Sequence, residues 1–113
     1  MEISKELISK VLEIDKRLLR IDEIKENHIF FYTMSNVGEY QNYINIYELA
    51  FKCKEWVYNE GYMMKIENHY LNSIQIQIRK PTANSMNKEP WKKTFKNEID
   101  GMIQVCQWIL DNK

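Results

Sequence analysis

Two segments in the two halves of the chain follow nearly the same pattern. Residues 6–14 read ELISKVLEI and residues 48–56 read ELAFKCKEW, so Glu, Leu, Lys and Glu recur at matching places. The tripeptide Glu-Asn-His also occurs twice, at residues 26–28 and 67–69, one position out of step with the first match. These matches predict one unit of a helix and two strands, used twice. Coincidence is the alternative, because Glu, Lys and Leu are common on helices.

The chain has the size and composition of one globular domain. It contains 113 residues, of which 44% are hydrophobic and 12% aromatic, enough to fill a hydrophobic core. We therefore expect a single domain over residues 1–113.

Apolar residues at helical spacing predict amphipathic helices over residues 3–14, from residue 46 to about residue 60, and after residue 97. Asn45 and Asn97 are predicted N-caps, and Gly61 is predicted to end the second helix in a left-handed conformation. The second helix has the apolar stripe Ile46, Leu49, Ala50, Cys53, Trp56 and Val57. In the last helix the predicted buried residues are Ile99, Met102, Ile103, Cys106, Ile109 and Leu110.

The segments between the helices have strand composition. Residues 18–24 and 28–34 predict a hairpin, residues 62–67 and 73–79 predict paired strands, and residues 91–95 predict a short edge strand. Two polar segments, residues 35–44 and 81–90, are predicted loops. The expected fold is therefore an α+β domain of order α-ββ-α-βββ-α, with an antiparallel sheet covered by amphipathic helices. Duplication of an αββ unit and a coincidental match are the two alternative origins of this order.

Two segments carry a resemblance to a known group of proteins. Residues 44–56 read INIYELAFKCKEW and residues 95–110 read FKNEIDGMIQVCQWIL. They resemble small proteins encoded by phages and prophages of ε-proteobacteria and, more distantly, the phage ABA sandwich domain, in which a Phe-ending strand leads into a capped helix with small residues and cysteine on one face. The chain departs from that pattern at Asp100-Gly101, where Glu-Ala is expected. The resemblance implies a cytoplasmic accessory protein without assigned activity and carries over no catalytic or binding residue.

Positive and negative charges balance over the whole chain, but they are unevenly distributed along the sequence. Sixteen basic and sixteen acidic residues give no general attraction to nucleic acid or membrane. Residues 79–96, however, hold six bases and one acid, interleaved with aromatic side chains. Positive charge attracts phosphates and aromatic rings stack on unpaired bases. Weak nucleic-acid binding is therefore an alternative function, through Arg79, Lys80, Lys88, Trp91, Lys92, Lys93 and Lys96.

The residue types for catalysis or metal binding are present without the required pattern. No two of Cys53, Cys106, His28 and His69 lie within five residues, so no compact metal motif exists. Both cysteines lie on predicted apolar stripes and are expected to be buried free thiols, typical of the cytoplasm; a disulfide would require the two helices to pack side by side. The three glycines are scattered, so no phosphate-binding loop is expected. We expect no enzyme, no metal, no cofactor, no signal peptide and no membrane span.

Tyrosines exceed the number that the core stripes require. Tyr47, Phe51 and Tyr58 form a second stripe on the second helix, and Tyr40 and Tyr43 lie in the preceding segment. Large amphipathic rings are favoured at protein interfaces. Either this stripe packs under a neighbouring helix, or it binds a protein or a second copy of the chain. The sequence thus favours protein binding through these five residues.

Overall fold

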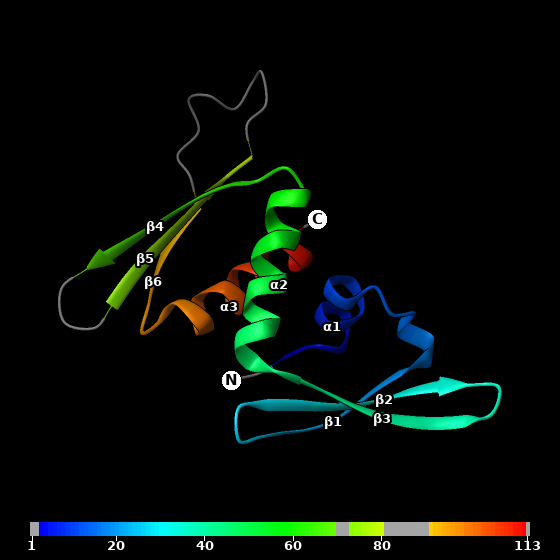
Figure 1. Cartoon of the computed structure of the whole chain (residues 1–113). Helices are drawn as coiled ribbons and strands as arrows, with labels where there is room; N and C mark the ends of the chain where they lie inside the picture. Colours follow the sequence, from blue (N-terminus) through cyan, green and yellow to red (C-terminus); the bar gives the residue numbers. More distant parts are fainter. Residues whose placement is uncertain (1–2, 70–72, 81–90, 113) are drawn as a thin grey trace.

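The computed structural model describes residues 3–69, 73–80 and 91–112. In these ranges the order is helix, three strands, helix, three strands, helix (Figure 1). The elements are α1 (Lys5–Leu12), β1 (Leu19–Lys25), β2 (His28–Ser35), β3 (Gly38–Asn45), α2 (Ile46–Asn59), β4 (Met63–His69), β5 (Ser73–Arg79), β6 (Trp91–Phe95) and α3 (Glu98–Asp111), with a short 3-10 turn (Lys16–Leu18) before β1.

The strands form two antiparallel sheets, each with its strands in chain order. One sheet has the order β1-β2-β3 and the other β4-β5-β6. The α+β class and the approximate order of elements are as predicted. The predicted single sheet is replaced by two separate sheets, and Figure 1 shows them on different sides of the helices.

Helix α2 begins and ends where the sequence signals predicted. The Asn45 side chain accepts a hydrogen bond of 2.8 Å from the amide of Tyr47, and Gly61 follows the helix with φ of +90°. Asn97 caps α3 in the same way, accepting from the amide of Asp100 at 2.8 Å. The first helix is shorter than residues 3–14, because Glu13 adopts a left-handed conformation and ends it.

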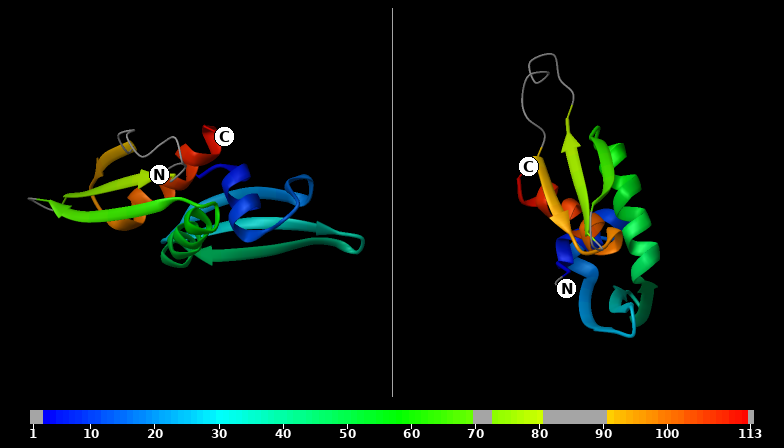
Figure 2. Two further views of the ribbon diagram at one scale, coloured as in Figure 1. Left: turned by 90° about the horizontal axis from the view of Figure 1, so that it is seen from above. Right: turned by 90° about the vertical axis from the view of Figure 1, so that its left-hand side faces the viewer.

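One hydrophobic core joins both halves of the molecule. Helices α2 and α3 pack against each other, with the fully buried residues Leu49, Cys53, Val57, Cys106 and Ile109 among the core residues they supply. Helix α1 covers one face of the first sheet, while α3 covers one face of the second. Figure 2 shows α2 along the outside of this assembly, so only one side of α2 is buried.

Gly101 sets the distance between α3 and the second sheet. A Cβ atom at this position would lie 2.6 Å from Cδ1 of Ile76 and 3.0 Å from Cδ2 of Phe95. The approach also explains why Val105, one turn further along α3, is fully buried although it lies off the predicted stripe. The departure from the expected Glu-Ala at Asp100-Gly101 therefore coincides with a close contact between α3 and the second sheet.

Three further predictions are corrected by the structure. Residues 35–44 are not a loop, because they contain the turn after β2 and most of strand β3. Trp56 is only partly buried, since it borders a hollow of ≈ 210 Å³ between α1 and α2. Ile99 is likewise half-buried rather than in the core.

The two repeated motifs behave differently. Leu7 and Leu49, which match in the helical repeat, are both fully buried on their helices. Residues 26–27 form the turn between β1 and β2 and His28 begins β2, whereas residues 67–69 are the last residues of β4. Only the helical match therefore occupies equivalent positions, and duplication of the unit stays a prediction.

Replacing Gly101 by Ala should destabilise the fold by about 1–3 kcal/mol, because the added methyl overpacks the contact with Ile76 and Phe95. This loss exceeds the gain of up to about 1 kcal/mol that Ala brings to a helix. Chemical denaturation measures the change. Ile76→Val removes Cδ1, the atom closest to the added methyl. It should therefore lower the free energy of unfolding less in the Gly101→Ala background than in the native protein. A stabilised Gly101→Ala variant would contradict the close packing.

Candidate protein-binding surface

Three aromatic side chains lie on the side of α2 that faces solvent. Tyr47, Phe51 and Tyr58 are 58%, 62% and 48% exposed. At 100° per residue they fall within an arc of about 40°, centred about 125° from the buried stripe. They therefore lie just beyond the flank of the helix, turned away from the core, and no described helix covers them. We call these three residues the aromatic face of α2.

The other two predicted binding residues, Tyr40 and Tyr43, are on β3. Tyr40 pairs with Thr33 and Tyr43 pairs with Phe30 in the ladder between β2 and β3. Residues three apart on a strand point to opposite faces. Ile44 is buried, so Tyr40 lies on the face toward α1 and Tyr43 on the face away from it. The structure therefore does not bring Tyr40 and Tyr43 together.

Tyr43 belongs to an aromatic cluster that the sequence analysis missed. Its ring centroid lies 5.7 Å from that of His28 and 6.0 Å from that of Phe30. Beside this cluster, the guanidinium of Arg20 lies 4.3 Å from the ring centroid of Tyr32. The alternation of His28, Phe30 and Tyr32 along β2 places these rings on one face of the strand. Only the pairing of β2 with β3 brings Tyr43 beside them, and the sequence does not predict that pairing.

The alternative nucleic-acid segment is divided between two faces of the second sheet. Lys92 pairs with Gln77 and Lys93 with the buried Ile76, so the two lysines point to opposite faces. Arg79, Lys80 and Lys96 are exposed, and Lys88 lies outside the described residues.

The aromatic rings of this segment pack within the protein. Trp91 stacks on Trp108 of α3, with 4.8 Å between ring centroids and 24° between planes. Phe95 is buried. Neither ring stands free to stack on a nucleic-acid base in this arrangement.

Cys53 and Cys106 meet where α2 packs on α3. Both are free thiols and both are fully buried. A hydrogen bond with Cys53 and burial raise the pKa of the Cys106 thiol well above its ordinary value. Because the thiolate is the nucleophile, this environment gives an unreactive structural thiol rather than a catalytic one.

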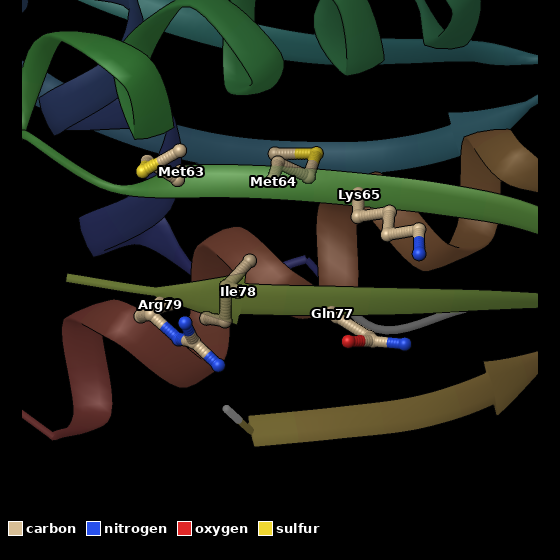
Figure 3. Close-up of a pocket in the computed structure, with 6 residues that line it drawn as sticks. All are labelled: Met63, Met64, Lys65, Gln77, Ile78 and Arg79. Carbon is tan, nitrogen blue, oxygen red and sulfur yellow. The ribbon is translucent and has the colours of Figure 1, made fainter. Parts of the chain in front are cut away.

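One hollow of ≈ 320 Å³ lies where β4 and β5 pair (Figure 3). It is lined by Met63, Met64, Lys65, Gln77, Ile78 and Arg79. The lining includes two cations but no carboxylate, imidazole or thiol that could act as a nucleophile or general base. Lys65 is already paired with Glu67 at 2.7 Å. The six residues that line this hollow thus do not form a catalytic arrangement.

Within the described ranges, no group of three or more His, Cys, Asp or Glu side chains could hold a metal ion. His28 lies in the surface cluster with Tyr43, away from the buried cysteines. In the same ranges, no helix has the length and apolar character needed to cross a membrane.

Comparison with known proteins supplies no relative. No protein-family model matches the chain, and no curated protein and no solved structure gives a significant match to it. The proposal about function therefore depends on the surfaces of this chain and on the sequence pattern of residues 44–56 and 95–110.

The cysteines of the native protein should react slowly with an aromatic disulfide reagent. After denaturation, two thiols per chain should react. The reason is that Cys53 and Cys106 are fully buried and the pKa of Cys106 is raised. Absorbance of the released reagent measures the rate. Val37→Cys, at an 81% exposed turn position, is the control and should react at once. Equally rapid reaction of the native protein would show that the cysteines are accessible.

Proposed function

We propose that this protein acts by binding another protein through the aromatic face of α2. The observation that carries the proposal is the alignment of Tyr47, Phe51 and Tyr58 on one exposed side of a helix whose other side forms the core. The spacing i, i+4, i+11 places the three rings in a row of three helical turns.

In the unbound protein these rings are exposed to water, which is unfavourable for their apolar surface. A partner that buries them gains the corresponding hydrophobic free energy. A buried aromatic side chain contributes on the order of 1.5–3 kcal/mol relative to an exposed one. Tyr and other aromatic residues are enriched at interfaces, because they combine a large apolar area with a polar group. Apolar patches on soluble proteins commonly mark such sites.

The charges beside the aromatic face indicate what kind of surface fits it. Glu48 and Glu55 are exposed and lie along one flank of the three rings. A helix that presents aligned apolar anchors is recognised by an apolar groove. The partner's groove should accordingly have basic residues along one rim, opposite Glu48 and Glu55.

The resemblance noted in residues 44–56 and 95–110 adds a biological setting to this proposal. It supports a non-enzymatic accessory protein of a phage or prophage that works in the cytoplasm. Binding to a host or phage protein would be its whole activity, without a cofactor or a metal.

Nucleic-acid binding through residues 79–96 is the weaker proposal. Its bases divide between two faces of the sheet, and Trp91 already stacks on Trp108. The aromatic face of α2, by contrast, consists of three side chains that are each about half exposed or more.

A photo-reactive phenylalanine analogue at position 51 should cross-link to a specific protein in an extract of the organism that encodes this chain. The same analogue at position 37, which is more exposed but lies on a hairpin turn, is the control. With the cross-linked protein identified and purified, Phe51→Ala should weaken its binding about tenfold or more, because interface aromatic residues are frequent hot spots. Val37→Ala should leave the affinity unchanged.

Two results would contradict the proposal. Position 51 would give no adduct beyond those of position 37, or Phe51→Ala would bind the purified partner as tightly as the native protein.

A further inference from the structure

The four edge strands of the two described sheets are not equally protected against pairing with another chain. Strand β1 carries four charges and a register shift between Ile21 and Glu23, and β6 has two lysines among five residues. Strand β4 carries Lys65 and Glu67. Charges and bulges of this kind discourage edge-to-edge pairing.

Strand β3 lacks these protections. Over its eight residues, Gly38–Asn45, the only charge is Glu39, which pairs across β2 with Arg20 of β1 at 3.3 Å. The strand contains no proline and no lysine, and its register with β2 has no shift. Its sequence, with two tyrosines and an isoleucine among amide side chains, favours further strand pairing.

The turns on both sides of β2 determine which backbone groups of β3 point outward. Residues 26–27 and 36–37 are two-residue turns, so Lys25 pairs with His28 and Ser35 with Gly38 as hydrogen-bonded pairs. Along β3 the even-numbered residues therefore bond to β2. The N–H and C=O groups of Glu39, Gln41 and Tyr43 point to the open edge.

These three residues are complementary to themselves when two copies run antiparallel. With Gln41 opposite Gln41 of a second copy, Glu39 lies opposite Tyr43 of that copy. No like charges face each other, and the two Gln41 side-chain amides meet across the axis. All three outward-facing residues then exchange backbone hydrogen bonds.

We propose that β3 binds β3 of a second copy, antiparallel across a two-fold axis at Gln41, to form one six-stranded sheet. The outer edges of that sheet would be the two β1 strands, which are charged and bulged. Assembly therefore stops at a dimer, and an isologous contact closes it. The proposal concerns a surface other than the aromatic face of α2 and does not depend on it.

Analytical ultracentrifugation over a concentration series tests the pairing. The native chain should shift from monomer to dimer as concentration rises. Gln41→Pro removes only an outward N–H, a substitution that edge strands tolerate, and should raise the dissociation constant about tenfold or more through loss of two inter-copy hydrogen bonds. Gln41→Thr keeps the N–H and favours a strand, so it should still dimerise. Phe51→Ala should also dimerise, which separates this contact from the α2 proposal.

Disulfide trapping keeps the test decisive if Gln41→Pro folds poorly. In oxidised glutathione, Gln41→Cys should form a covalent dimer, because Cα atoms in a hydrogen-bonded pair lie about 5.5 Å apart, within disulfide range. Glu39→Cys should not, since the two copies of position 39 would be about 14 Å apart along the strands. The native cysteines are buried and do not compete.

Three outcomes would overturn the proposal. These are a native chain that stays monomeric at every concentration, cross-linking at position 39 as strong as at position 41, and growth into species larger than a dimer.

Discussion

The packing of α2 against α3 is the contact on which the two halves of this protein depend. Helix α2 starts directly after β3 and leads into β4, so it connects the two sheets in sequence. Its buried residues Leu49, Cys53 and Val57 meet the apolar side of α3, and Lys54 pairs with Glu98 at 3.9 Å at the margin. Because this contact uses one side of α2 fully, the rings of Tyr47 and Phe51 are left on the other side.

The same arrangement leaves much of the sheet surface open. The radius of gyration is 15.7 Å, against about 13 Å for a compact domain of this length. Helices cover one face of each sheet, and an antiparallel sheet tolerates water on its other face. Figure 2 shows the resulting flat, spread shape. The bare sheet faces, the β3 edge and the exposed side of α2 are all surfaces on which a further protein chain can pack.

The sequence predicted the elements whose signals are local. Asn45 and Asn97 cap their helices, Gly61 ends α2, and Ile74, Ile76 and Ile78 alternate inward along β5. Each of these depends on a few neighbouring residues. Strand β3 was missed because Ile44 is its only buried residue, so an open edge strand gives no alternation of apolar and polar positions. Because the sequence predicts a loop over residues 35–44, the opposite orientations of Tyr40 and Tyr43 do not follow from it.

The central claim is that α2 has one core side and one binding side, and the stability of two variants tests it most directly. Leu49→Ala should lower the free energy of unfolding by about 2–5 kcal/mol, as truncation of a fully buried leucine does. Phe51→Ala, two residues away, should change it by no more than about 0.5 kcal/mol, as substitutions at exposed sites do. Denaturant unfolding of both variants gives the comparison. Equal losses of stability would show that Phe51 belongs to the core and would contradict the account.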